Sequence, residues 1–438
     1  MAALHFSCVL LVALVSIGTA FHSPAGFPSP SDTPRLTDGT HLSARSPFSF
    51  SQPTSDHTSL SRRQAWERVA AAATVTTSGL LLPTPQVASA STQSVSTTMQ
   101  ATPALIPTTR LGNSDLVVSR TIQGYWQLAG GHGRYKETDA IANMKRHYDA
   151  GFTTLDTADI YGPSEIIMGK FIKTQPQAIP CTKFCCFRFL DEIDRAEVKQ
   201  RILNSCERLQ VNKLPLVNFF WSNYGIKKYV DVGLFLAELK EEGLIGEIGA
   251  TNFDLQRLQE LKNSGVPVVA HQVQMSALDR RAVQSGMATW CAENNVSLTT
   301  YGTVGSGILS DRYLGKGAPT QEERNTASMR MYSTTASRFG DWKLVQDLLR
   351  TMDAVANEVR SDGRCTQATI SNIAQRYVLE TPAVASILIG VRNPEHIAEN
   401  ARTHSFTLTQ AERDAIDTIV AKRKGPQGDV WDIERGTM

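Results

Sequence analysis

The sequence has little net charge and lacks the long hydrophobic run that a membrane-spanning helix needs. The apolar stretch at 4–17 is too short to cross a bilayer comfortably. A formal net charge of +2 over 438 residues is too small to imply binding to nucleic acid or to an anionic membrane. With 41% hydrophobic residues the chain can bury a large core. We therefore expect a soluble globular protein with no nucleic-acid partner and, in its mature form, no membrane partner.

Cysteine pairs with the spacing of metal ligands are also absent. The seven cysteines show no CxxC pattern of the kind that holds zinc, so we expect no metal site; they are Cys8, Cys181, Cys185, Cys186, Cys206, Cys291 and Cys365. Cys185 and Cys186 are adjacent, and adjacent cysteines rarely pair with each other. Buried or free thiols are favoured, and a redox switch beside Lys183 is the alternative.

A third absence is the dinucleotide-binding fingerprint GxGxxG after the first strand. Gly130, Gly131 and Gly133 lie close together, but in a loop and without that spacing. Short apolar runs alternate with amphipathic stretches such as 226–242 and 254–264, which predicts parallel strands joined by crossover helices. The sequence thus indicates an α/β protein. A segment rich in Ser, Thr, Gly and Arg, at 306–340, is expected to form a loop rather than a domain.

The most informative residues that are present lie in the run 155–165, with Lys183 after the next short strand. Asp156 ends a strand predicted over 151–155, and Tyr161 follows in a loop. A carbonyl group that accepts a hydride develops negative charge on its oxygen, and a tyrosine can supply the proton if a cation lowers its pKa. Lys183 would be that cation, and Asp156 would hold the lysine in an ion pair. This combination points to hydride-transfer chemistry.

The run 151–169 with Lys183 resembles the signature of the aldo-keto reductase family. Later segments resemble further motifs of that family in the same order, at 246–253, 271–274, 300–302 and 389–400. The resemblance covers 108–438 and implies one (β/α)8 TIM barrel that uses NADPH to reduce a small-molecule aldehyde or ketone. It implies catalytic roles for Asp156, Tyr161 and Lys183, and cofactor binding by Thr251, Asn252, Gln272, Tyr301, Arg392, Glu399 and Asn400.

Within the implied cofactor site, each residue has a role and an alternative. Asn252 and Gln272 would hold the nicotinamide carboxamide, although both could instead satisfy loop backbones. Tyr301 would stack on the nicotinamide ring. Arg392 follows a strand and precedes a helix start, where anions bind, and its planar fork suits a 2′-phosphate; as an alternative it is a solvated surface charge.

One element of the family pattern is missing. Where the family has a histidine at the end of the fourth strand, this chain has Phe220, which can wall an apolar pocket but cannot donate a hydrogen bond. We assign Phe220 and Trp126 to the substrate pocket, with packing under the first loop as the alternative for Trp126. The tail at 425–431 is expected to fold over the substrate opening. The missing donor supports a second hypothesis, a catalytically weakened protein that binds NADP(H) as a sensor or for a partner.

The catalytic assignments also have alternatives in the sequence alone. Asp156 and Lys183 could form a structural ion pair, and Tyr161 could simply pack. Two charged groups at consecutive strand ends of a barrel lie on the face where such enzymes work, which favours catalysis.

The N-terminal residues have a different composition from the rest. Residues 1–20 predict a secretory signal peptide, and 21–107 are rich in Ser, Thr, Pro and Arg, as in a transit region followed by a linker. Phe21 directly after the cleavage point resembles two-part plastid leaders, so we expect the plastid (chloroplast) stroma. Within 62–90, a twin arginine, an apolar run and a small-residue site resemble a thylakoid-transfer segment, which would lead to the thylakoid lumen instead. The sequence carries no signal for an oligomeric state.

Overall fold

Eight parallel strands close into a barrel in the computed structural model, which describes residues 106–436. Each strand pairs with the next one along the chain, and the last, β10, closes the ring against β3. This arrangement confirms the (β/α)8 barrel. The strands are β3 (Thr121–Gly124), β4 (Thr154–Asp156), β5 (Ile179–Cys186), β6 (Leu214–Trp221), β7 (Ile245–Thr251), β8 (Val268–Gln274), β9 (Ser297–Tyr301) and β10 (Val384–Gly390).

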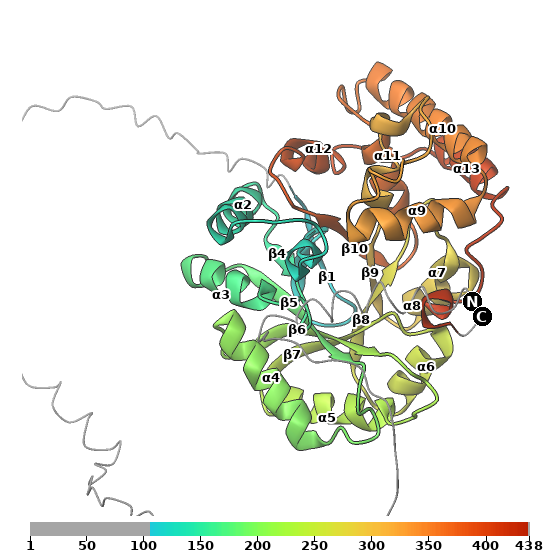
Figure 1. The fold of residues 1–438 in the computed structure, drawn as a ribbon. Coiled ribbons are helices and arrows are strands. Elements are labelled where there is room, and N and C mark those ends of the chain that lie inside the picture. Colours follow the sequence, from blue (N-terminus) through green and yellow to red (C-terminus); the bar gives the residue numbers. More distant parts are fainter. Residues whose placement is uncertain (1–105, 437–438) are drawn as a thin grey trace, which may run out of the picture. The chain divides into compact units, whose positions relative to one another are not determined.

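Helices wrap the outside of the barrel and connect successive strands (Figure 1). The α-helices are α2 (Glu137–Asp149), α3 (Ser164–Thr174), α4 (Arg195–Leu209), α5 (Tyr229–Glu241), α6 (Leu255–Asn263), α7 (Arg281–Gln284), α8 (Met287–Glu293), α9 (Ala327–Phe339), α10 (Trp342–Ser361), α11 (Ile370–Leu379), α12 (Ile397–Arg402), α13 (Gln410–Val420) and α14 (Asp432–Arg435). Short 3-10 turns form η1 (Trp126–Ala129), η2 (Gly305–Gly307) and η3 (Asp311–Tyr313). In this described part of the chain, every helix is too short or too polar to cross a membrane.

Side-chain caps explain where several helices begin. The Asp254 side chain accepts a hydrogen bond from the backbone N–H of Arg257 at the start of α6. Thr409 and Glu412 form a reciprocal capping box at the start of α13. The helix expected over 254–264 is therefore confirmed, and so is the cap expected at Thr409.

A hairpin covers the amino end of the barrel. Its strands β1 (Thr108–Arg110) and β2 (Val117–Ser119) pair antiparallel. Leu111 and Val118 from the hairpin form one buried cluster with side chains near the strand starts, namely Cys181, Leu216, Val269, Ala270 and Ala385. With this end covered, a ligand site is expected among the loops at the carboxyl ends of the strands.

The segment 306–340 is more regular than its composition suggested. It contains η3 and the whole of α9, so the expectation of a simple loop was wrong. The Thr326 side chain caps α9 by accepting from the backbone N–H of Met329 at 3.1 Å. One face of α9 is buried because Met329, Tyr332, Ala336 and Phe339 recur at helical spacing. Tertiary packing of this face outweighs the loop-like composition.

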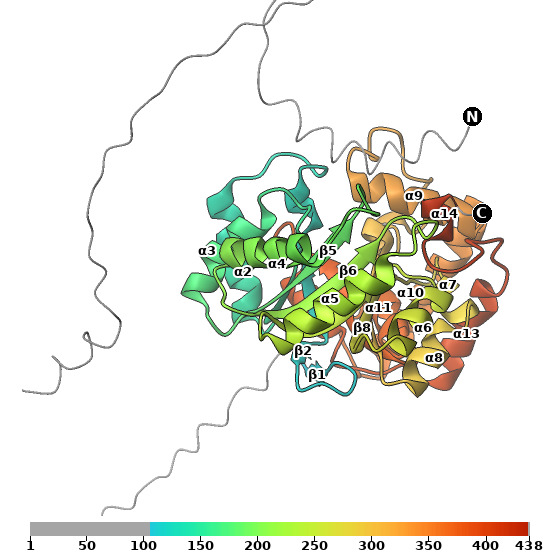
Figure 2. The same ribbon diagram turned by 90° about the horizontal axis from the view of Figure 1, so that it is seen from below.

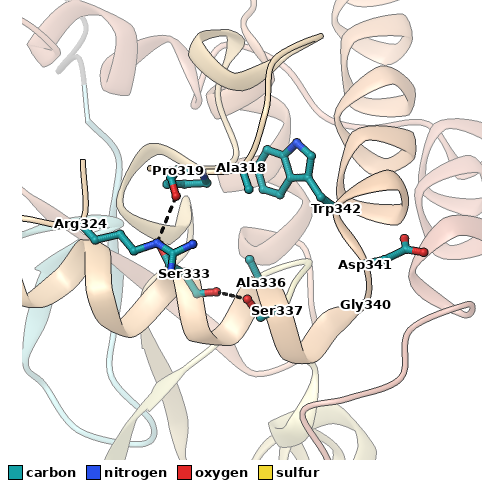
Figure 3. A pocket seen from close by; sticks show the side chains of 9 residues that line it. All are labelled: Ala318, Pro319, Arg324, Ser333, Ala336, Ser337, Gly340, Asp341 and Trp342. Atoms are coloured by element: carbon teal, nitrogen blue, oxygen red, sulfur yellow. Dashed lines mark hydrogen bonds between the residues drawn. The ribbon is translucent and has the colours of Figure 1, made fainter. Parts of the chain in front are cut away.

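A cavity of about 210 Å³ lies between α9, the start of α10 and the loop before α9 (Figure 3). Arg324, Ser333 and Trp342 are among the residues that line it. None of the site residues expected from the sequence lines this cavity, so we do not assign it to the active site.

Candidate active site

Asp156 and Lys183 form a buried ion pair on adjacent strands, β4 and β5. The Lys183 ammonium lies 2.5 Å from Asp156 Oδ1 and 2.8 Å from the carbonyl oxygen of Thr157. The side chain of Lys183 is only 7% exposed and that of Asp156 only 6%. Burial alone would lower the pKa of Lys183, but the attraction of Asp156 and then of Tyr161 raises it above its ordinary value. The lysine is thus held in its charged form.

Tyr161 lies beside this ion pair. The Lys183 nitrogen is 5.1 Å from the centroid of the Tyr161 ring. Burial raises the pKa of Tyr161 to about 12, although the charge of Lys183 acts to lower it. The lysine therefore opposes the effect of burial without overcoming it, whereas the sequence argument expected a pKa below the usual value. A phenol with this pKa is protonated at neutral pH and is able to donate its proton.

Gln272 contacts the carboxylate of Asp156 directly. Its Nε2 donates a hydrogen bond of 2.9 Å to Asp156 Oδ2, joining residues 116 positions apart. Because Lys183 occupies the other oxygen, both oxygens of this buried carboxylate accept a hydrogen bond. The sequence assigned Gln272 to the cofactor amide, and the contact that the structure shows is with Asp156.

The turn after β7 brings Asn252 to Tyr301. Asn252 has a left-handed φ of 57°, which asparagine tolerates better than most residues. Its backbone N–H donates to the carbonyl oxygen of Gln272 at 3.0 Å, and Thr251 Oγ1 donates to the same oxygen at 3.0 Å. The Tyr301 hydroxyl donates to Asn252 Oδ1 at 2.9 Å. The structure therefore brings Thr251, Asn252, Gln272 and Tyr301 together.

Phe220 and Trp126 lie in different surroundings. Phe220 is near the carboxyl end of β6, the fourth strand of the barrel, and packs in an apolar cluster that includes Cys185 and Tyr161. Trp126 begins η1 and packs edge-on against His132, with ring centroids 5.0 Å apart. Phe220 is thus placed beside the candidate proton donor, whereas the contact shown for Trp126 is with its own loop.

Arg392 borders a separate cavity beyond the end of β10. It is exposed, and no hydrogen bond or ion pair joins it to another residue in 106–436. The cavity has a volume of about 200 Å³ and is also lined by His132, Arg134 and Lys136. Burial, and then the charges of Arg392 and Arg330, lower the pKa of His132 to about 4. Arg134, Lys136 and Arg392 outnumber the one acidic residue in the lining, Asp139, so the charge around this cavity is positive on balance, which suits an anion.

Glu399 and Asn400 hold α12 against α11. Glu399 accepts a hydrogen bond from Thr369 Oγ1 at 2.9 Å. Asn400 Oδ1 accepts from Gln375 Nε2 at 3.0 Å, and Asn400 is buried. The structure brings neither residue to the group around Tyr161, and their role at a cofactor stays a prediction.

The cysteines near the site are buried and free. This holds for all six cysteines of the described residues, including Cys185 and Cys186 at the end of β5. Burial, and then the charge of Asp159, raise the pKa of the Cys185 thiol well above its usual value. A protonated, buried thiol is a poor nucleophile, so the geometry favours packing over a redox switch.

Two aromatic side chains at the site were not assigned from the sequence. The indole N–H of Trp431 donates to the Tyr301 hydroxyl at 2.9 Å. Tyr332 on α9 packs against Gly302, where a Cβ would lie 2.6 Å from the Tyr332 ring. No motif marks either residue, although the expectation that the tail at 425–431 folds over the opening had pointed to the right segment.

The closed eight-stranded barrel is the fold that the resemblance to aldo-keto reductases implied. A model of the Aldo/keto reductase family matches residues 121–421, and the chain belongs to that family. Its members are oxidoreductases that use a nicotinamide cofactor.

Several known proteins resemble the chain over most of the barrel. The NADH-specific methylglyoxal reductase of Escherichia coli (strain K12) is 23% identical over 325 residues, covering 69% of this chain and 94% of the relative. The chloroplastic pyridoxal reductase of Arabidopsis thaliana is 27% identical over 241 residues, covering 50% of this chain and 66% of that protein.

Among solved structures, a glycerol dehydrogenase from Gluconobacter oxydans matches with a TM-score of 0.60 and 20% identity, covering 73% of this chain and 97% of that one. An aldo-keto reductase from Bacillus halodurans, in its holo form, matches with a TM-score of 0.56 and 24% identity, covering 72% and 96%. These structural matches show the shared fold.

Proposed function

We propose that this protein reduces a small aldehyde or ketone with NADPH as the hydride donor. The observation that carries the proposal is the buried Asp156–Lys183 ion pair beside Tyr161, at the carboxyl end of the family barrel. Bound NADPH would supply the hydride. Tyr161 would donate its proton to the carbonyl oxygen, and the Lys183 ammonium would stabilise the phenolate that remains. Asp156 would keep that ammonium charged and in position.

Unpaired polar groups at the strand ends support a polar ligand there. The side-chain oxygens Gln274 Oε1 and Thr303 Oγ1 lie at the end of β8 and just beyond β9. Both are buried and have no hydrogen-bond partner among residues 106–436. Such atoms are rare in folded proteins unless a ligand or water satisfies them. The residues that would hold the cofactor are Thr251, Asn252, Gln272 and Tyr301 at the nicotinamide, and Arg392, Glu399 and Asn400 at the adenosine phosphate.

The choice of NADPH over NADH rests on Arg392. Its guanidinium has no partner in the described part of the chain and borders a cavity that Arg134 and Lys136 make positive. A planar, permanently charged fork suits the 2′-phosphate that distinguishes NADPH from NADH. Because the Escherichia coli relative is named as NADH-specific, NADH is the necessary comparison.

A cofactor-binding protein without turnover is the second candidate, and Phe220 favours it. A phenyl ring beside Tyr161 cannot donate a hydrogen bond to the carbonyl oxygen. The loss of one such donor typically lowers a rate by a factor on the order of 10² to 10³. Under this alternative the protein would bind NADP(H) as a sensor or for a partner.

Single-turnover oxidation of bound NADPH distinguishes the two candidates. The carbonyl panel includes methylglyoxal and pyridoxal, because these compounds occur in the names of relatives. We expect Tyr161→Phe to slow oxidation by a factor on the order of 10² or more while NADPH still binds. Tyr148→Phe is the matched control, since Tyr148 lies on α2 and packs against Phe171, with ring centroids 5.9 Å apart.

Each outcome bears on one of the two candidates. Binding of NADPH without any Tyr161-dependent oxidation across the panel would contradict the reductase hypothesis and leave the hypothesis of a binding protein. Failure to bind either NADPH or NADH would exclude both candidates.

A further inference from the structure

The C-terminal tail is hydrogen-bonded to α7, to the end of β6 and to the start of α6. It ends in α14, drawn at the red end of the chain in Figure 2. Glu434 accepts two hydrogen bonds from the buried Arg281 guanidinium, at 2.7 and 3.0 Å. Arg435 donates to the carbonyl oxygen of Trp221 at 3.0 Å, and Asp429 accepts from the backbone N–H of Leu255 at 2.7 Å. These contacts fix the segment on both sides of Trp431.

Phe220 supports the ring that this tail carries. The rings of Phe220 and Trp431 meet edge-to-face, with centroids 5.2 Å apart and planes at 74°. This is a favourable aromatic geometry. Phe220, which the sequence comparison places at the position of the family histidine, therefore serves as a packing surface for Trp431.

The Tyr301 hydroxyl makes two hydrogen bonds, one with Trp431 and one with Asn252. An indole N–H can only donate, so the Tyr301 oxygen must accept from Trp431 at 2.9 Å. The single hydroxyl proton of Tyr301 is then available for Asn252 Oδ1, also at 2.9 Å. In the structure the amide oxygen of Asn252 faces Tyr301 and its NH₂ group points away.

We infer that Trp431 is a positioning residue for the nicotinamide end of the cofactor site. It holds the Tyr301 hydroxyl, and through it the Asn252 amide, in one orientation before the cofactor arrives. The inference rests on the proposed function, in which Asn252 and Tyr301 contact the nicotinamide. Pre-organisation of this kind lowers the cost of ordering the site on binding.

Calorimetric titration of the full-length protein with two probes tests the inference. NADPH, with NADH in parallel, carries the nicotinamide, whereas ADP-ribose lacks it. We expect Trp431→Phe, which keeps a ring against Phe220 but removes the N–H, to weaken NADPH binding about three- to tenfold, as for one lost hydrogen bond. Binding of ADP-ribose should not change.

Trp342→Phe is the matched control. The Trp342 indole donates to the carbonyl oxygen of Lys316 at 2.8 Å, beside the cavity shown in Figure 3. The Trp342→Phe variant also loses an indole hydrogen bond, but beside a cavity that none of the assigned site residues lines. We expect this variant to bind both probes as the wild type does.

A double variant adds an independent check. If Trp431 acts through Tyr301, then Tyr301→Phe with Trp431→Phe should bind NADPH no more weakly than Tyr301→Phe alone. Wild-type affinity in Trp431→Phe, an equal loss for ADP-ribose, or additive effects in the double variant would each overturn the inference. A wild type that binds neither NADPH nor NADH would instead show that the proposed function itself is wrong.

Discussion

Single side chains at the site contact residues that are far apart in the sequence. Asp156 is an example, because its two carboxylate oxygens accept from Lys183 and from Gln272. Removing charges from water costs free energy, and a buried pair is tolerated when its hydrogen bonds are satisfied. Breaking such a pair typically costs about 3–5 kcal/mol. We therefore expect this pair to contribute to the stability of the fold as well as to the proposed chemistry.

Arg392 provides a test of cofactor choice at the same scale. We expect Arg392→Gln to weaken NADPH binding by about tenfold or more, because a charge-assisted hydrogen bond contributes about 1.5–3 kcal/mol. Binding of NADH should change little. Titration calorimetry with both cofactors measures the ratio of the NADPH and NADH affinities. Arg146→Gln, a substitution of an exposed residue on α2, is the control. Equal losses for NADPH and NADH would remove the argument for a 2′-phosphate contact.

At the scale of elements, α9 and α14 bring residues from late in the chain to the mouth of the barrel. α9 contributes Tyr332 beside Gly302, and the segment before α14 contributes Trp431 beside Tyr301. β4, β5 and the loop after β4 hold Asp156, Lys183 and Tyr161, whereas α9 and the tail pack around the mouth. Loops and appended helices of this kind vary between barrels that share one chemistry.

The contact between α9 and the end of β9 predicts the effect of one substitution. Gly302 has a φ of +77°, and an added Cβ would lie 2.6 Å from the buried Tyr332 ring. Gly307 has a φ of +88°, but nothing lies within 4 Å of its added Cβ. Gly302→Ala should therefore lower the free energy of unfolding by about 1 kcal/mol or more beyond Gly307→Ala, since both share the backbone strain. Urea denaturation of the two variants measures the difference, and equal losses would argue against this close approach.

For the whole molecule, buried histidines set the response to acid. Burial lowers the pKa of His271 to about 3 and the pKa of His132 and His404 to about 4, and it also lowers that of His147. When the pH falls below 6.5, the ordinary pKa of histidine, the unfolded chain takes up protons that the folded protein does not. Stability is therefore present above pH 6.5 and is lost as pH falls toward these lowered values.

We expect the free energy of unfolding to fall between pH 6.5 and 5, by up to about 1.4 kcal/mol per pH unit for each such histidine. Urea denaturation at several pH values gives the slope. His271→Gln should make the slope shallower, because glutamine does not titrate. The fold should be kept, because a glutamine can still accept from the backbone N–H of Phe253, as His271 Nε2 does at 3.1 Å. A slope that is flat or of opposite sign in the wild type would contradict the argument.

The cellular address is also a property of the whole chain, and it remains a proposal. We propose a plastid protein, from the composition of 1–107, most of which lies outside the described residues 106–436. N-terminal sequencing of the mature protein from its source tests this. A start near Ser91 would favour the thylakoid lumen, whereas a start upstream of 62–90 would favour the stroma. An N-terminus that retains residues 1–20 would contradict both addresses.

Local spacing along the chain was enough to predict much of the fold and the grouping of Asp156, Tyr161 and Lys183. Asp156 ends β4 and Tyr161 lies in the loop that follows, whereas Lys183, expected to close its strand, lies within β5, which continues to Cys186. Alternating strand and helix patterns position strand ends of this kind on one face. The helices near 226–242 and 254–264 were predictable because apolar periodicity and caps are local signals.

The tertiary structure decided which side chains meet across the mouth. Gln272 reaches Asp156 over 116 positions and Trp431 reaches Tyr301 over 130, distances at which no periodic pattern carries information. It also decided the pKa of Tyr161, because burial by surrounding elements outweighs the nearby lysine. The sequence by itself was enough to predict the barrel and to propose the chemistry, since both inferences depend on short-range patterns. Closure of the barrel and docking of the tail determined the environment in which that chemistry operates, since desolvation and packing depend on every element that surrounds the site.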